Sequence, residues 1–355
     1  MSGQNNLGII EGFFGRVWDW ETRYHYAEFL KENQYEFYIY APKADQCLRS
    51  RWQDDWPQEE WEALQKFGDV YSQAGLSWGV GLSPYEIYLN YDQEAIAAIE
   101  KKVRYLNKLD LNIIAVLFDD MRGDADELSQ IQVDVVHRIA DLSTAESVIM
   151  CPTYYTDDPI LEKLFGKKPE GYLQSLGKQL DSKIDVFWTG EKVCSTEYPA
   201  SHLKDVGDRL GRKPFIWDNY PVNDGAKLSL YLFLRAFENR HEMGNLVSGH
   251  AVNPMNQPYL SKIPLKTLPV SYEQQENYDP AIAFREAVIS TCPENLSNAL
   301  INDIGAFQDQ GLGELSDSDK EKLIGKYLSF PEPAAQEVVQ WLQGEFEFDP
   351  ACLTG

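Results

Sequence analysis

Eight short runs of apolar, aromatic and β-branched residues recur along this chain, and helical patterns separate them. The runs cover residues 7–12, 35–42, 76–83, 111–118, 146–153, 183–190, 212–219 and 245–252. Between them, stretches such as 21–33 and 58–75 repeat apolar residues at the i, i+3, i+4 spacing of an amphipathic helix. Eight βα units over roughly 260 residues match the size of a (β/α)8 barrel. The sequence therefore predicts an α/β protein in which residues 1–270 form a TIM-type (β/α)8 barrel.

The alternation of strands and helices stops after the eighth unit. Residues 279–311 and 317–346 carry helical patterns that Pro and Gly interrupt. We therefore predict a C-terminal helical region over residues 271–355, which either forms a small domain or packs against the barrel.

The charge and hydropathy of the chain disfavour two classes of partner. The formal net charge is −24, whereas contacts to phosphate groups need clustered Lys and Arg. No apolar segment approaches the ~20 residues that span a bilayer, and the first residues lack the basic and apolar parts of a signal peptide. We expect an intracellular, cytoplasmic protein that binds neither nucleic acid nor a membrane.

Cysteine and histidine usage disfavours a metal or redox site. The five cysteines are far apart and form no CxxC pair, and the five histidines are scattered. Reduced thiols fit this pattern better than a disulfide framework or a zinc site. We expect no metal and no cofactor.

Ten residues lie at or just beyond the carboxyl ends of seven of the eight predicted strands, and most of them are polar or aromatic. They are Gly12, Lys43, Asp119, Asp120, Tyr155, Thr189, Trp217, Asn219, Asp224 and Asn253. In a barrel of this kind the carboxyl ends of all strands meet at one face, which is where active sites gather. The sequence therefore predicts one site that these residues share.

Asp119 and Asp120 directly follow an almost unbroken apolar run, as expected for a strand buried on both faces. Neighbouring strand residues point to opposite faces, so both aspartates reach one cavity only if the chain bends there. Two carboxyl groups that close together cannot both ionise easily, so the pKa of one should rise. Two other interpretations remain open at this stage: one aspartate caps the next helix, or one forms a salt bridge with Lys43.

The residue types at the strand ends suit a sugar. Amides, carboxylates and a lysine can bind hydroxyl groups, and Trp217 offers a flat apolar surface. Ordinary glycosidases place two carboxylates about 5 Å or more apart, across the bond that breaks. Adjacent aspartates lie on one side of that bond, so the substrate must supply its own nucleophile.

Seven motifs, in order and each at a strand end, resemble one known family. They are GIIEGFFGRVW, YIYAPKAD, LFDDM, CPTYY, FWTGEKV, IWDNYPVND and NPMNQP, between residues 8 and 258. The chain resembles the β-N-acetylglucosaminidases of glycoside hydrolase family 84, which include the protein O-GlcNAcases and their bacterial relatives.

The resemblance implies substrate-assisted hydrolysis of terminal β-linked GlcNAc through an oxazoline, with net retention. By position, Asp119 would hold the acetamide N–H, and Asp120 would protonate the leaving oxygen and later activate water. Tyr155 and Asn219 would orient the acetamide and the acid, and Trp217 and Thr189 would wall the pocket. The sugar hydroxyls would be bound by Gly12, through its backbone, Lys43, Asp224 and Asn253. The implied partner is a glycoprotein or another conjugate that carries GlcNAc.

Two other functions remain open from the residues alone. One is a sugar-binding module without catalysis, which the same amide and aromatic groups would permit. The other is a metal-dependent barrel hydrolase that uses an acidic cluster made of Asp119, Asp120, Asp124, Asp126 and Glu127.

Overall fold

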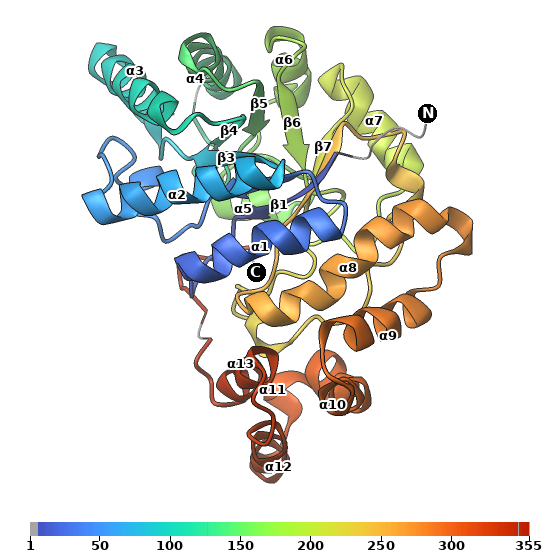
Figure 1. Ribbon diagram of the computed structural model, residues 1–355. Coiled ribbons are helices and arrows are strands. Elements are labelled where there is room, and N and C mark those ends of the chain that lie inside the picture. Colours follow the sequence, from blue (N-terminus) through green and yellow to red (C-terminus); the bar gives the residue numbers. More distant parts are fainter. Residues whose placement is uncertain (1–5, 126, 347, 355) are drawn as a thin grey trace.

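A computed structural model describes residues 6–125, 127–346 and 348–354 of the chain, and within them eight parallel strands form a closed barrel (Figure 1). The strands are β1 (Leu7–Glu11), β2 (Phe37–Tyr40), β3 (Ser77–Leu82), β4 (Ile113–Leu117), β5 (Ser147–Cys151), β6 (Asp185–Trp188), β7 (Phe215–Asp218) and β8 (Gly249–Val252). Each strand pairs with the next one along the chain, and β8 closes the barrel on β1, where Ile9 lies opposite Val252. Each predicted run contains one strand, so the predicted barrel is confirmed.

Helices surround this barrel on the outside (Figure 1). They are α1 (Trp20–Glu32), α2 (Gln58–Ala74), α3 (Gln93–Leu106), α4 (Leu128–Leu142), α5 (Ile160–Phe165), α6 (Tyr172–Gln179), α7 (Ala200–Leu210) and α8 (Pro258–Gln274). The connection from β7 to β8 departs from the regular pattern. All of its residues are described, and it holds only the short 3-10 turns Leu228–Leu230 and His241–Met243 in place of an α-helix.

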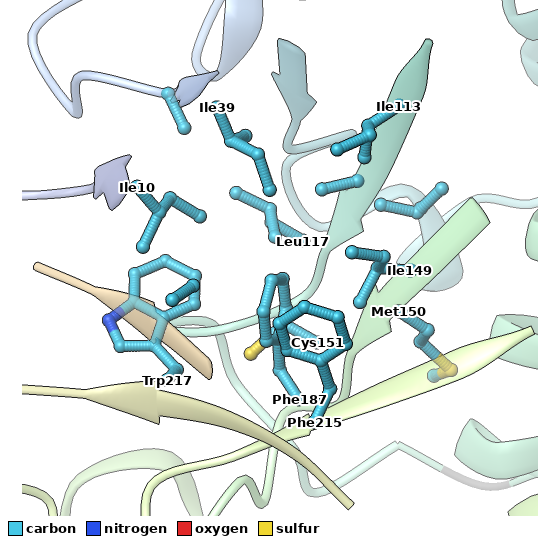
Figure 2. Close-up of a cluster of buried hydrophobic side chains, with 14 of the residues drawn as sticks. Ile10, Ile39, Ile113, Leu117, Ile149, Met150, Cys151, Phe187, Phe215 and Trp217 are labelled. Carbon is cyan, nitrogen blue, oxygen red and sulfur yellow. The ribbon is translucent and has the colours of Figure 1, made fainter. Parts of the chain in front are cut away.

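Apolar side chains from different strands fill the interior of the barrel (Figure 2). Six of them, each at most 2% exposed, are Ile10, Ile39, Leu117, Ile149, Phe187 and Phe215. The Phe187 ring lies edge-on to both Phe215 and Trp217, with 5.2 Å between ring centroids in each pair. Trp217 is the last of these rings toward the carboxyl ends of the strands, so the packed core directly supports that face. Burying a side chain of this size stabilises the fold by about 1.5–3 kcal/mol.

The C-terminal helices form a second apolar cluster beside the barrel. They are α9 (Pro280–Thr291), α10 (Glu294–Ile304), α11 (Gly311–Glu314), α12 (Asp317–Tyr327) and α13 (Pro333–Leu342), with a π-helical turn at Gly305–Gln310. Leu232 and Leu234 from the β7–β8 connection, together with Leu260 from α8, share this cluster. The same helix α8 packs Leu265 and Leu268 into the barrel cluster. The helical region therefore shares residues with the barrel, and the division at residue 270 stays a prediction.

In the part of the chain that is described, none of the helices is long and apolar enough to cross a membrane.

Candidate active site

One cavity lies at the carboxyl ends of the strands, and all ten residues singled out from the sequence line it. Eight further residues complete the lining: Phe14, Cys151, Val193, Cys194, Val222, Leu228, Cys352 and Thr354. The fold thus brings the ten predicted residues together although they are up to 241 positions apart, as parallel strands in a barrel must do.

The chain bends where the two aspartates follow β4. Asp120 has a φ of 55°, in the left-handed region that Asp tolerates better than most residues. Because of this bend, two consecutive side chains enter the same cavity, as the sequence required. Arg49 holds the bend, since its Nη2 donates to the Asp120 carbonyl oxygen over 2.9 Å and its Nη1 to that of Asp119 over 3.5 Å.

The two carboxylates have different partners. Lys43 Nζ forms an ion pair with Asp119 Oδ2, so the salt bridge that the sequence left open does exist. The second oxygen of Asp119, Oδ1, is buried and has no hydrogen-bond partner among the described residues. Asp120 Oδ1 instead accepts a hydrogen bond of 3.1 Å from the Tyr155 hydroxyl. Neither aspartate caps the following helix, because the residue at the N-cap of α4 is Glu127.

The electrostatic environment raises the pKa of one of the two adjacent carboxyl groups, that of Asp120. Burial and the adjacent charge of Asp119 raise the pKa of the Asp120 carboxyl above its ordinary value. Lys43, Arg49 and the hydrogen bond from Tyr155 act in the opposite direction. The rise in one pKa that the adjacent pair predicts therefore falls on Asp120.

Asp224 is a second carboxyl group in the cavity whose pKa is raised. Burial raises the pKa of Asp224 to about 6, although its Oδ2 accepts a hydrogen bond of 2.8 Å from the Phe14 backbone N–H. A group with this pKa changes its charge within the pH range in which most enzymes are assayed.

Hydrogen bonds of two asparagines connect the ends of β1, β7 and β8. Asn219 Oδ1 accepts from Trp217 Nε1 over 2.9 Å and from Asn253 Nδ2 over 3.0 Å. Asn253 Oδ1 accepts from the Gly12 N–H over 3.2 Å, and Asn219 Nδ2 donates to the Val193 carbonyl over 2.9 Å. These contacts fix the orientation of both amides and of the Trp217 indole.

Gly12 has a steric reason to be glycine. A Cβ atom at this position would lie 2.4 Å from the Trp217 ring, far closer than a real contact allows. Because its N–H is already bound, Gly12 would have to use its carbonyl oxygen in any contact with a ligand.

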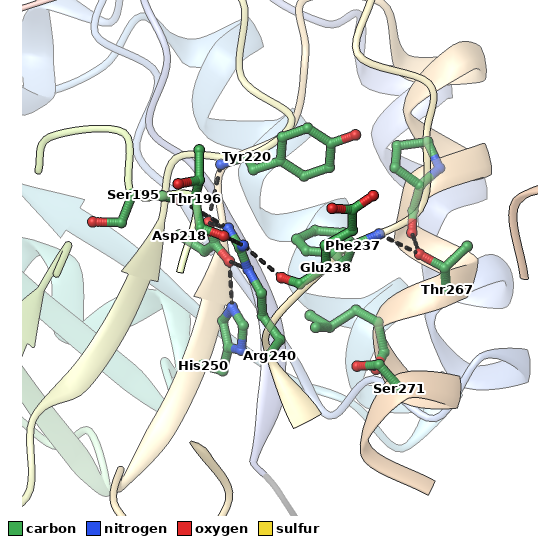
Figure 3. A network of polar contacts seen from close by, with 12 residues as sticks. Ser195, Thr196, Asp218, Tyr220, Phe237, Glu238, Arg240, His250, Thr267 and Ser271 are labelled. Carbon is green, nitrogen blue, oxygen red and sulfur yellow. Dashed lines mark hydrogen bonds and ion pairs between the residues drawn. The ribbon is translucent and has the colours of Figure 1, made fainter. Parts of the chain in front are cut away.

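A buried ionic network surrounds Asp218, the last residue of β7 (Figure 3). Asp218 receives two 3.0 Å hydrogen bonds from Arg240 and lies 3.1 Å from Nε2 of His250. Burial acts to raise the pKa of Asp218, but Arg240 and His250 outweigh it and lower that pKa to about 2. Arg240 also donates to the carbonyl oxygens of Ser195 and Thr196, which links the end of β7 to the loop after β6.

Some lining residues could have been found from the sequence and others could not. Phe14, Cys151 and Val193 lie inside motifs at the predicted strand ends. Arg49 donates hydrogen bonds to backbone carbonyl oxygens, and such contacts leave no residue pattern in the sequence. Residues 352 and 354 line the cavity although they lie far along the chain from the predicted strands.

The acidic cluster considered for a metal is dispersed in the structure. Among the described residues, no three His, Cys, Asp or Glu side chains lie close enough to hold a metal ion. Asp124 is exposed and pairs with Arg122 at 3.1 Å, and Asp126 lies outside the described residues.

Comparisons with known proteins agree with this geometry. A family model described as beta-N-acetylglucosaminidase matches residues 7–302. The protein O-GlcNAcases of Rattus norvegicus and Mus musculus are each 28% identical over 280 residues, which is 76% of this chain and 30% of theirs. A mutant O-GlcNAc hydrolase of Thermobaculum terrenum matches with a TM-score of 0.78 and 28% identity, over 95% of this chain and 80% of that one. The chain therefore spans about 30% of the length of the curated relatives.

Proposed function

This chain belongs to the β-N-acetylglucosaminidase family of glycoside hydrolases, and from that premise we propose that it removes terminal β-linked GlcNAc from proteins or other conjugates. The reaction is substrate-assisted and retains the anomeric configuration. The observation that carries the proposal is Asp119 Oδ1, a buried carboxylate oxygen without a partner among the described residues, in the same cavity as Asp120. A buried acceptor left unpaired costs about 1–3 kcal/mol, which a donor on the ligand recovers.

In the first step the carbonyl oxygen of the 2-acetamido group attacks the anomeric carbon and the glycosidic bond breaks. Asp119 accepts a hydrogen bond from the acetamide N–H and stabilises the positive charge that develops on the sugar ring. Asp120, whose pKa is raised by burial and by Asp119, gives its proton to the leaving oxygen. The products of this step are an oxazoline in the cavity, whose former N–H proton has passed to Asp119, and a free hydroxyl group on the former carrier.

In the second step Asp120, now ionised, takes a proton from a water molecule that attacks the anomeric carbon of the oxazoline. The oxazoline ring opens, Asp119 returns the proton to the acetamide nitrogen, and GlcNAc leaves with its original anomeric configuration. The same carboxyl group thus serves first as acid and then as base. A carboxylate nucleophile across the bond is not required, which agrees with two aspartates that are adjacent in the chain.

The remaining lining residues have binding roles in this proposal. Lys43 forms an ion pair with Asp119 and binds sugar hydroxyls together with Asp224 and Asn253. Trp217 and Thr189 form walls, and Tyr155 and Asn219 hold the acid and the acetamide in place. The names of the relatives, protein O-GlcNAcase and O-GlcNAc hydrolase, support a glycoprotein as substrate.

Paired substrates provide the test. The chain should hydrolyse an aryl β-N-acetylglucosaminide and release the β-anomer first, while the matching aryl β-glucoside, which lacks the internal nucleophile, should turn over at least about 10⁴-fold more slowly. Comparable rates on both substrates would contradict substrate assistance. Binding of GlcNAc without hydrolysis would favour a sugar-binding module, and loss of activity in EDTA would favour a metal-dependent hydrolase.

A further inference from the structure

The chain returns to the active-site cavity after its last helix. Beyond α13 the chain runs back toward the barrel (Figure 1). Two residues of the segment 348–354, Cys352 and Thr354, line the same cavity as Asp119 and Asp120. A tight turn shapes the segment, since the N–H of Cys352 donates to the Asp349 carbonyl over 2.9 Å. Cys352 is only 8% exposed in this position.

Thr354 connects the segment to the acid. Burial and the charge of Asp120 raise the pKa of the Tyr155 hydroxyl well above its ordinary value, and the nearby Thr354 side chain partly opposes that rise. Tyr155 in turn donates to Asp120. A threonine side chain thus lies in the same cavity as the proposed acid, near the tyrosine that donates to this acid.

With the segment in place the cavity is too small for a sugar. Its free volume is about 40 Å³, whereas one water molecule needs about 10–15 Å³ of such space and ligand sites span about 300–1,000 Å³. A few water molecules therefore fit, and an N-acetylated pyranose ring does not. The neighbouring cavity, which shares Cys194, Asn219, Val222 and Leu228 with this one, keeps about 420 Å³, so the restriction is local to the site that holds the segment.

The segment has few apolar contacts to hold it there. Phe346 is buried in the second apolar cluster, and the Arg16 guanidinium lies 5.0 Å from the centroid of its ring. Beyond that anchor, Phe348 is 44% exposed and Leu353 is 55% exposed. A segment whose large apolar side chains face solvent gains little from hydrophobic burial, so its release from the cavity costs little free energy.

We propose that residues 348–354 are an intramolecular competitor of the substrate. The segment places a threonine hydroxyl beside the acid, where the proposed function puts the serine or threonine hydroxyl released from a glycoprotein. Substrate binds only to the fraction of molecules in which the segment has left, so the segment raises the apparent KM without changing kcat. This inference rests on the proposed function, because it takes the cavity to be the GlcNAc site.

Two variants of the chain test this competition against a matched control. One lacks residues 348–355, and the other carries Cys352→Asp, which adds a carboxylate to the cavity that already holds Asp119, Asp120 and Asp224 and so expels the segment. Leu353→Asp adds the same charge one residue along, at an exposed position, and is the control. If about 10% of molecules are open, both variants should lower the KM for an aryl β-N-acetylglucosaminide about tenfold at unchanged kcat, while Leu353→Asp leaves both constants as they are.

Each outcome decides the proposal. Thermal unfolding identifies a variant that fails to fold, and the other variant then carries the test. An unchanged KM would overturn the inference, and a raised KM would overturn it too, because the segment would then complete the site instead of blocking it. Absence of turnover by the full chain and by both variants would overturn the proposed function, and this inference with it.

Discussion

The hydroxyl of Tyr155 lies 3.1 Å from Oδ1 of Asp120 and donates a hydrogen bond to it. This bond favours the ionised form of Asp120, as do the charges of Lys43 and Arg49, while burial and Asp119 favour the protonated form. The balance leaves the pKa of Asp120 raised. A carboxyl group whose pKa is raised keeps its proton to higher pH, which suits the proposed role of Asp120 as the acid of the first step.

The first prediction separates the two aspartates by the leaving group of the substrate. Asp120→Ala should slow substrates with poor leaving groups by about 10² to 10⁴, and should slow activated aryl glycosides far less, because only the former need a proton. Asp119→Ala should slow both classes, since every substrate needs its acetamide oriented. The measurement is kcat/KM across a series of aryl N-acetylglucosaminides of increasing leaving-group pKa.

Asp124→Ala is the matched control for this series. Asp124 lies on the same connection, is exposed and pairs with Arg122, and does not line the cavity. It should leave the whole series unchanged. Equal losses on all leaving groups in Asp120→Ala would contradict its assignment as the acid.

The second prediction concerns the basic limb of the pH profile. If kcat/KM falls at high pH because Asp120 loses its proton, Asp120→Asn should keep its residual activity on an activated substrate to high pH. Arg49→Gln should move the limb of the otherwise intact enzyme to higher pH, because Arg49 lowers the pKa of Asp120 and its removal lets that pKa rise. A limb that survives in Asp120→Asn would assign the proton to another group.

The barrel and most of the site could be predicted because both follow from local patterns. Parallel strands buried on both faces read as continuous apolar runs, and the barrel itself places the residues at the carboxyl ends of these runs at its mouth. Even the bend at Asp120 followed from the need to bring two consecutive side chains into one cavity.

The features that the sequence did not predict depend on contacts between distant segments. The β7–β8 connection forms no α-helix, and its Leu232 and Leu234 pack into the cluster of the C-terminal helices. Tertiary packing of this kind can override local helix propensity. Residues 352 and 354 carry no motif of their own. Their approach to the cavity depends on where α13 ends and on how the chain turns after it.

The third prediction concerns Asp224, whose pKa burial raises to about 6. Above that pH the carboxylate is ionised and accepts hydrogen bonds from sugar hydroxyls, and below it the group is protonated and loses acceptor strength. We therefore expect KM to rise as the pH falls through about 6, while kcat changes less. Asp224→Asn should show a raised KM that no longer varies over this range, and a variant that keeps the pH dependence of KM would assign it elsewhere.

The last prediction concerns the ionic network around Asp218. Asp218→Asn leaves the Arg240 guanidinium buried without its charged partner, which should cost about 3–5 kcal/mol in the free energy of unfolding. The control is Asp309→Asn, which breaks another Asp–Arg pair with two hydrogen bonds, here to the half-exposed Arg235, and should cost at most about 1 kcal/mol.

The pH dependence of stability gives a second readout for Asp218→Asn. The pKa of folded Asp218, about 2, lies below its ordinary value of 3.8, so between these values the folded state binds fewer protons than the unfolded state. The contribution of Asp218 to stability is therefore complete above pH 4 and is lost as the pH falls toward 2. Denaturant unfolding from pH 2 to 7 should show the gap between the parent chain and Asp218→Asn narrowing in that acidic window, and a gap that stays constant would mean that the charge of Asp218 is not what stabilises this face of the barrel.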